Sequence, residues 1–332
     1  MKFPRRKFLH LAAGAAALPA IALPAISRRA QAETWPSGAI RIIVPFPAGG
    51  STDVIARLAQ AGLQQRLGTT VIIENRGGAS GIVGAAAVAK AAPDGNTWLL
   101  DFDNHGANPF VVPNIPYDTE RDFAPVQLVG TSPYVLSTPA SRPFRTLADV
   151  IVEAKSKPDT LTVSNATIGT VGHLAAVMLA DRAGIKLVHV PYRGAGPQMN
   201  DLLAGHVDLA MASSATTLPH LQGGMIRLIA QTGMTRVPGL PEVPTIAESG
   251  LDGFEVRAWW GLYAPSRTPT DIIKRFGDAF AASLRDGQVA KQLMETQQVV
   301  MALNGPDELR QFLAVQMTKW AAIVQQYGIR AE

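Results

Sequence analysis

The stretch that decides the fold class reads Val44-Pro45-Phe46-Pro47-Ala48-Gly49-Gly50-Ser51-Thr52-Asp53. It follows a β-branched run at residues 40–46 and precedes an amphipathic segment at residues 52–66, so it predicts a turn from a strand into a helix. In open α/β sheets, ligands bind beyond the carboxyl ends of the strands, where the first N–H groups of a helix are free to hold an anion. The alternative is an ordinary tight turn, in which Ser51 or Thr52 caps the helix and Asp53 stabilises its first turn.

Two further loops of small residues have the same character. One reads Asn165-Ala166-Thr167-Ile168-Gly169-Thr170-Val171-Gly172-His173 and again joins a predicted strand to a predicted helix. The other is Gly77-Gly78-Ala79-Ser80-Gly81, which lacks the G-x-S-x-G frame of a hydrolase because Ile82 stands two residues after the serine. Loops from the two halves of the chain are therefore expected to face one another across a cleft.

The rest of the sequence alternates short β-branched runs with Ala- and Leu-rich segments, which is typical of βαβ units around a largely parallel sheet. Strands are predicted at residues 40–46, 71–74, 98–102, 126–129, 134–137, 161–164, 187–190, 208–212, 228–231, 254–263 and 299–302. Helices are predicted, among other places, at residues 52–66, 172–183, 197–203, 270–284 and 306–326. Eleven strands are too many for one small doubly wound sheet, so two α/β lobes are expected. The predicted crossings near residues 130–134 and 250–253 assign residues 33–130 plus 254–332 to lobe 1 and residues 131–253 to lobe 2.

The first 32 residues are expected to be an export signal and not part of the fold. Arg5-Arg6-Lys7-Phe8-Leu9 resembles a twin-arginine head, an apolar stretch spans residues 11–26, and Ala30-Gln31-Ala32 suits a signal peptidase. The alternative is a membrane anchor, but the apolar stretch is short and contains Pro19 and Pro24, whereas a spanning helix needs about 20 apolar residues. A cleaved signal and a periplasmic location are therefore predicted.

Removal of this segment changes the charge balance. Six of the 30 basic residues and none of the 26 acidic residues lie within it, so the remaining chain has 24 basic and 26 acidic residues and a net charge of −2. No later Lys/Arg cluster favours nucleic acid or a membrane surface. The sequence contains no cysteine, which excludes disulfides, thiolate metal sites and cysteine nucleophiles.

Candidate catalytic and metal-binding groups are scattered along the sequence. No pair among the six histidines has the i, i+4 spacing with a glutamate that marks a zinc protease helix. Asp101 and Asp103 form a close carboxylate pair near His105, which we interpret as part of a solvated loop. We interpret His173 as a structural, hydrogen-bonding histidine inside its helix. No catalytic residue, metal or cofactor is therefore expected.

The predicted strand at residues 254–263 contains Arg257-Ala258-Trp259-Trp260. Alternation places Arg257 and Trp259 on one face and Trp260 on the other, so that a guanidinium and an indole would share a pocket wall. The alternative is a surface arginine that covers the edge of a core tryptophan.

Taken together, these stretches resemble the Bug-type extracytoplasmic receptors of tripartite tricarboxylate transport systems, over essentially the whole chain after the signal. The resemblance rests on an ordered series of motifs: residues 44–53, 74–81, 93–95, 117–118, 122–126, 189–194, 201–205 and 243–245. It implies a two-lobed periplasmic binding protein of type II-like α/β architecture, with two mixed sheets flanked by helices and a ligand cleft between the lobes. It also implies loops that hold a carboxylate through backbone groups, short hydroxyls and ordered water.

The resemblance assigns ligand contacts in this sequence to Phe46, Gly49, Gly50, Ser51, Thr52, Thr167, Gly169 and Thr170. The predicted ligand-binding set also contains Ser80, Ser213, Arg257 and Trp259. The sequence departs from the family at Ser164-Asn165-Ala166-Thr167, and at Ala212-Ser213-Ser214, where many relatives have an acidic residue. The loss of an acid and the gain of Arg257 favour a ligand with a second negative group over an amino-bearing one.

The function implied is that of a solute-binding protein, which captures a small carboxylated compound for a tripartite tricarboxylate-type transporter. A dicarboxylate, an aromatic acid and a keto acid are the candidate ligands. The expected partners are this ligand and a membrane permease, without nucleic acid, and the protein is expected to be a monomer. The alternatives are an exported hydrolase or lyase on the same scaffold, and a ligand sensor for a signalling kinase.

Overall fold

The computed structural model describes residues 35–221 and 223–330, and the predicted export signal lies outside them. The strands are β1 (Ile40–Val44), β2 (Val71–Asn75), β3 (Thr97–Phe102), β4 (Phe123–Pro139), β5 (Thr162–Asn165), β6 (Val188–Pro191), β7 (Leu209–Ser213), β8 (Ile226–Gln231), β9 (Arg257–Pro265) and β10 (Val300–Asn304). The α-helices are α1 (Ser51–Leu67), α2 (Ile82–Ala89), α3 (Asn104–Val111), α4 (Leu147–Ser156), α5 (Val171–Ala183), α6 (Ala195–Leu203), α7 (Ser214–Thr217), α8 (Thr270–Leu284), α9 (Gly287–Gln297) and α10 (Pro306–Tyr327). Two short 3₁₀ helices are η1 (Ala79–Gly81) and η2 (Leu218–His220). Within this part of the chain, no helix is long and apolar enough to cross a bilayer.

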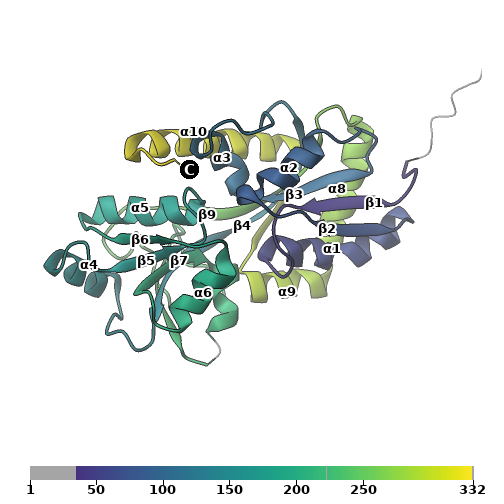
Figure 1. Cartoon of the computed structure of the whole chain (residues 1–332). Helices are drawn as coiled ribbons and strands as arrows, with labels where there is room; N and C mark the ends of the chain where they lie inside the picture. The colour runs from purple at the N-terminus through teal and green to yellow at the C-terminus, as the bar shows by residue number, and fades with distance from the viewer. Residues whose placement is uncertain (1–34, 222, 331–332) are drawn as a thin grey trace, which may run out of the picture. The chain divides into compact units, whose positions relative to one another are not determined.

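The first sheet has the strand order β2-β1-β3-β9-β4-β10. Strands β1, β2 and β3 are parallel, whereas β9 is antiparallel to β3 and β4, and β10 is antiparallel to β4. The carboxyl ends of β1, β2 and β3 therefore meet at one edge of the sheet. The loops that start there lead into α1, α2 and α3 (Figure 1).

The second sheet has the order β8-β4-β7-β5-β6, so β4 belongs to both sheets (Figure 1). Residues 123–133 of β4 pair with β9, and residues 134–139 pair with β7 and β8. Strands β5, β6 and β7 are parallel to one another and run against β4, whereas β1 to β3 run with it. The carboxyl ends of both parallel sets consequently point toward the part of β4 that joins the two sheets.

The two strands predicted at residues 126–129 and 134–137 are one continuous strand, so the predicted break between them is wrong. Pro133 pairs with Arg257 at the first residue of β9, and Val135 pairs with the last residue of β8. The proline therefore stands where β4 changes partners along one edge. A missing N–H is tolerated at such a position, and the backbone stays extended.

Aromatic side chains on two consecutive residues of β9, Trp259 and Trp260, pack on opposite faces of the first sheet. Trp260 lies in a core cluster with residues of α1 and α8. In the same cluster, Trp98 of β3 stacks on Phe276 of α8 with ring centroids 3.8 Å apart. Trp259 packs on the opposite face with Leu309 and Leu313 of α10. The predicted alternation of the two tryptophans is confirmed, because successive side chains of a strand point to opposite faces.

Asp101, Asp103 and His105 are buried, so their interpretation as a solvated loop is wrong. Their exposed fractions are 2%, 0% and 0%. His105 Nδ1 lies 2.9 Å from Asp101 Oδ2, and the imidazole packs against the rings of Tyr117 and Tyr263. The end of β3 is polar because its side chains bond one another inside the protein, and not because water reaches them.

Candidate ligand-binding site

A buried carboxylate organises the loop between β1 and α1. Asp53 Oδ2 accepts hydrogen bonds from the Gly49 N–H and from Arg57 Nε, both at 2.8 Å, and its Oδ1 accepts one from Asn75 Nδ2 at 3.0 Å. Asn75 Nδ2 also donates to the Phe46 carbonyl at 3.1 Å, which ties the loop to the end of β2. Burial alone would raise the pKa of Asp53, but the donors on Arg57, Gly49 and Asn75 lower it, so the carboxylate is ionised at neutral pH.

Next to this loop, the first turn of α1 presents N–H groups that have no partner among the residues that the structure describes. Its N-cap is Gly50, which has an extended conformation, and no side chain within residues 35–221 and 223–330 caps it. The N–H groups of Ser51, Thr52 and Asp53 donate to no described residue, whereas the Val54 N–H closes on the Gly50 carbonyl. Ser51 and Thr52 do not cap the helix, because it already begins at Ser51. An uncapped start of this kind, at the positive end of a 17-residue helix, suits an anion.

The loop between β2 and α2 approaches the same place in a strained conformation. Residues 78–81 all have positive φ, including 46° at Ala79 and 54° at Ser80. A left-handed non-glycine residue costs roughly 1–2 kcal/mol, and such strain is concentrated at functional sites. A Cβ on the last residue of the loop would lie 3.2 Å from Phe46 Cζ, so the loop passes close to this half-buried ring.

The loop between β5 and α5 is held by its own hydroxyl groups. Thr170 Oγ1 accepts a hydrogen bond from the His173 N–H at 3.4 Å and donates to the Thr167 carbonyl at 2.8 Å. Thr167 Oγ1 donates to the Tyr192 carbonyl, in the loop after β6, at 3.3 Å. Thr170 therefore caps α5 and stabilises the loop's own backbone, and Thr167 ties the loop to the one after β6.

Gly169 in this loop donates a hydrogen bond to His173 and lies close to α3, the helix that follows β3. Its φ is 77°, and its N–H donates to His173 Nδ1 at 3.1 Å. Burial, with a smaller contribution from His189, lowers the pKa of His173 to about 4, so the imidazole remains a neutral acceptor at neutral pH. A Cβ at Gly169 would lie 2.0 Å from Val111 Cγ1, so this position requires glycine.

Helix α3 lies between the strand-end loops of the two sheets. Its Asn108 Nδ2 donates to the Ser80 carbonyl at 3.1 Å, and its Asn104 Oδ1 accepts from the Val171 N–H at 3.4 Å. Residues of α3 were absent from the predicted site, because the segment is short and contains Pro109, which argues against a helix. The structure thus brings together the β2–α2 loop and the β5–α5 loop through a helix that the sequence did not indicate.

Two of the predicted residues serve the fold in this structure. Ser213 ends β7 and caps α7, because its Oγ accepts the Thr216 N–H at 3.3 Å. Trp259 is completely buried, with its ring edge-on to Phe312 at a centroid distance of 5.5 Å. A Cβ at Gly106 would lie 3.4 Å from Trp259 Cζ2, so the indole supports α3 from below the loops.

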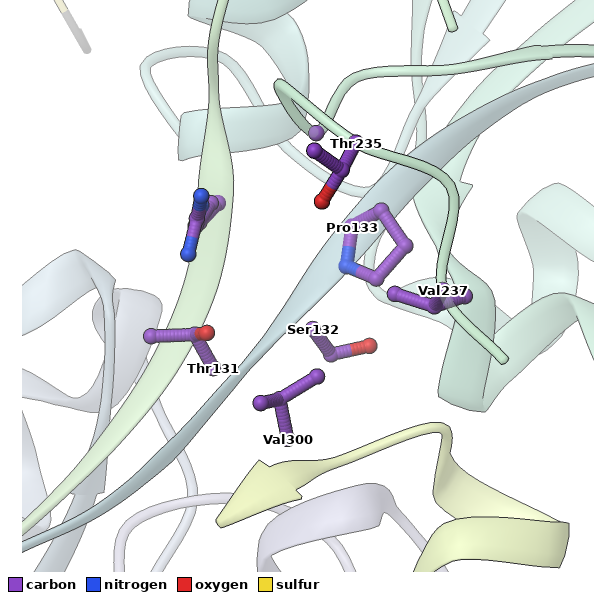
Figure 2. Close-up of a pocket in the computed structure, with 8 residues that line it drawn as sticks. Thr131, Ser132, Pro133, Thr235, Val237 and Val300 are labelled. Carbon is purple, nitrogen blue, oxygen red and sulfur yellow. The ribbon is translucent and has the colours of Figure 1, made fainter. Parts of the chain in front are cut away.

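A pocket opens where β4 passes from one sheet to the other (Figure 2). It contains about 380 Å³ of empty space, partly open to solvent, and we call it the junction pocket; it is lined by Thr131, Ser132, Pro133, Gly233, Thr235, Val237, Arg257 and Val300. Arg257 Nε forms an ion pair with Glu255 at 2.6 Å, and the arginine side chain is 41% exposed. Arg257 is the one residue of the predicted ligand-binding set among the residues that line this pocket.

The sequence and structure of the chain are similar to those of known proteins. The tripartite tricarboxylate transporter family receptor model matches residues 55–329. Protein BugT of Bordetella pertussis is 33% identical over 312 residues, which cover 93% of this chain and 95% of BugT. A Rhodopseudomonas palustris protein solved with adipate is 32% identical, with a TM-score of 0.84, and the match covers 90% of this chain and 100% of that one. MatC from the same organism, with bound malate, is 32% identical, with a TM-score of 0.79, and the match covers 87% of this chain and 99% of MatC.

These similarities confirm the resemblance to Bug-type receptors, the periplasmic-binding-protein fold and the function of a solute receptor. The matched residues include α1 from its second turn onward, the strained loop, α3 and the β5–α5 loop. The chain belongs to the family of tripartite tricarboxylate transporter receptors.

Proposed function

We propose that this protein is a periplasmic receptor that binds a small carboxylate and passes it to a tripartite tricarboxylate-type permease. The observation that carries the proposal is the start of α1, where the N–H groups of Ser51, Thr52 and Asp53 have no partner among the described residues. A carboxylate suits this place, because it complements the positive helix end and accepts more than one N–H bond. The adipate and malate in the two solved relatives support a carboxylate as ligand.

The proposed cleft lies between the parallel strand ends of the two sheets. Its first wall is the β1–α1 loop with Phe46, Gly49, Gly50, Ser51 and Thr52, joined by Ser80. Its second wall is the β5–α5 loop with Thr167, Gly169 and Thr170. Arg257 completes the proposed ligand contacts from the junction pocket, and the other two predicted residues, Ser213 and Trp259, support the cleft from within the fold. The pairing of β4 with β9 up to Pro133 and with β7 from Tyr134 supports lobes formed by residues 33–130 plus 254–332 and by residues 131–253. We also propose that residues 1–32 are removed on export and that the receptor is a monomer.

Calorimetric titration tests the proposed function. The protein without residues 1–32 is titrated with malate, adipate, an aromatic acid and a keto acid, and we expect one-site binding of at least one of them. The ligand is then recovered by denaturation and identified by mass spectrometry. Unchanged ligand supports a receptor, whereas a converted product, or no binding across the whole panel, would contradict the proposal.

Arg257→Ala tests whether the junction pocket takes part in ligand choice. If the Arg257 guanidinium binds a second acidic group of the ligand, it contributes a charge-assisted hydrogen bond of about 1.5 kcal/mol, or roughly tenfold in affinity. We take the low end of the range because Glu255 and solvent compete with the ligand for the guanidinium. We therefore expect the variant to bind a diacid such as adipate about tenfold more weakly and to bind the matching monoacid unchanged. Titration of both acids at fixed salt checks this. Equal losses for the two acids would remove Arg257 from the site.

A further inference from the structure

The starts of α3 and α5 face one another across the place where the two sheets join. Helix α3 follows β3 of the first sheet, and α5 follows β5 of the second sheet. Asn104 Oδ1 accepts the Val171 N–H at 3.4 Å, which is the first amide of α5. The two helices therefore join the sheets through a direct contact in addition to the shared strand β4.

A second hydrogen bond spans the same junction. The Tyr134 hydroxyl, from the part of β4 that pairs with β7, donates to Asp103 Oδ2 at the N-cap of α3 at 2.7 Å. Gly172, the second residue of α5, lies against the same tyrosine, since a Cβ there would be 3.0 Å from Tyr134 Cε1. Asp103, Asn104 and Tyr134 are 0%, 6% and 5% exposed, so water does not compete for these bonds.

In the buried pair of Asp103 and Tyr134, the tyrosine hydroxyl is the hydrogen-bond donor. Burial raises the pKa of Asp103 well above its usual range, against the lowering effect of the Tyr134 hydrogen bond. Burial, and then the charge of Asp103, raise the pKa of Tyr134 as well, so the hydroxyl keeps its proton and donates it. Breaking this bond without opening the junction would leave two polar groups buried and unpaired, which is unfavourable.

The contact contrasts with the start of α1. At α1 the first amides have no described partner, whereas at α5 Asn104 takes the Val171 N–H and Thr170 takes the His173 N–H. Two of the first amides of α5 thus have protein acceptors, one of them on α3, whereas the first amides of α1 remain available to an anion. Because Thr167 and Gly169 immediately precede α5, the contact also fixes where these loop residues stand.

We propose that Tyr134 and Asn104 are positioning residues, which fasten the start of α5 to α3 and so set the affinity of the receptor without touching its ligand. The proposal rests on the proposed function, since the affinity is that for the carboxylate. The loss of either bond lets the second wall of the cleft move away from the first. The bound acid then escapes faster, while its entry is little affected.

Tyr134→Phe separates this role from core packing, because the ring remains among its apolar neighbours and only the hydroxyl is lost. Asn104→Ala removes the other bond. The matched control is Tyr263→Phe, which removes a buried tyrosine hydroxyl that has no hydrogen-bond partner among the described residues. We expect both junction variants to bind malate or adipate roughly fivefold more weakly, with the change mainly in the dissociation rate measured by stopped flow, and the control to bind as wild type.

Amide hydrogen exchange of residues 171–173 provides a readout that needs no ligand. We expect these amides to exchange roughly fivefold to tenfold faster in Tyr134→Phe and Asn104→Ala than in the wild type or in Tyr263→Phe. Wild-type exchange in both junction variants would show that the contact does not hold α5, and wild-type dissociation rates would show that it does not set affinity. Either result overturns the proposal. A wild-type protein that binds none of the acids would instead defeat the proposed function, and the exchange rates would still decide whether the contact holds α5.

Discussion

Gly50→Val is expected to abolish carboxylate binding while the protein stays folded. Gly50 has φ −72° and ψ 166°, an extended conformation open to any residue, and its Cβ would lie 3.4 Å from the Pro47 carbonyl oxygen. A valine is therefore tolerated by the protein but stands at the open end of α1, over the amides that the anion needs. Loss of two charge-assisted hydrogen bonds corresponds to at least a hundredfold in affinity.

The comparison with neighbouring glycines sharpens this experiment. Gly49 has φ 83°, so a valine there would add backbone strain to any effect on binding. Gly287→Val is the matched control, because Gly287 is the first residue of α9, Asp286 caps this helix, and a Cβ at Gly287 would have no atom of the described residues within 4 Å. Titration and thermal unfolding of both variants are compared with wild type. Wild-type affinity in Gly50→Val would show that the carboxylate is not held at the start of α1.

Asp53→Ala is expected to weaken both folding and binding. The substitution leaves the Gly49 N–H, Arg57 and Asn75 Nδ2 without the buried carboxylate that they share. We expect the free energy of unfolding to fall by about 2–4 kcal/mol and the affinity to fall at least tenfold, because the loop over α1 is no longer held. Asp286→Ala removes an exposed helix cap elsewhere, and should cost only about 1 kcal/mol without affecting affinity.

The pH dependence of the Asp53 effect has a definite sign. The hydrogen bonds of Asp53 lower its pKa in the folded protein below the ordinary value of 3.8, so its contribution is complete above that value. The contribution is lost as the pH falls through the folded pKa, when the carboxylate takes up a proton. Urea unfolding should therefore show a large difference between wild type and Asp53→Ala at pH 7 and a smaller one at about pH 3. An equal difference at both pH values would contradict the role of the ionised carboxylate.

Much of the fold follows from local sequence patterns. The β-branched run before Gly49 and Gly50 predicts β1 and the turn into α1, and the period of residues 270–284 predicts α8 with the observed ends. The predicted break in β4 was wrong at Pro133, because a proline indicates the end of a strand unless the strand is known to change partners beside it. Patterns within a segment thus predict elements better than they predict how long strands are shared between sheets.

The strand-to-helix loops of the candidate site follow from local sequence, whereas the contacts around α3 depend on residues that are distant in the sequence. The two glycines before a helix predicted the turn into α1, but left open whether Ser51 or Thr52 caps the helix or its first N–H groups hold an anion. Asp103 and Tyr134 are 31 residues apart and bond only after the two sheets have joined, so no local pattern distinguishes this buried carboxyl from a solvated one. Trp259 shows the same limit, because strand alternation gives its face but not the helix that covers it.

A crystal structure of the protein with the acid that titrates is the most direct test of where the ligand lies. The account predicts a carboxylate at the start of α1, with its oxygens bonded to at least two of the N–H groups of Ser51, Thr52 and Asp53 at about 3 Å, directly or through one ordered water. It also predicts the β5–α5 loop on the opposite side of the ligand. A carboxylate bound wholly within the junction pocket, with only solvent at the start of α1, would contradict it.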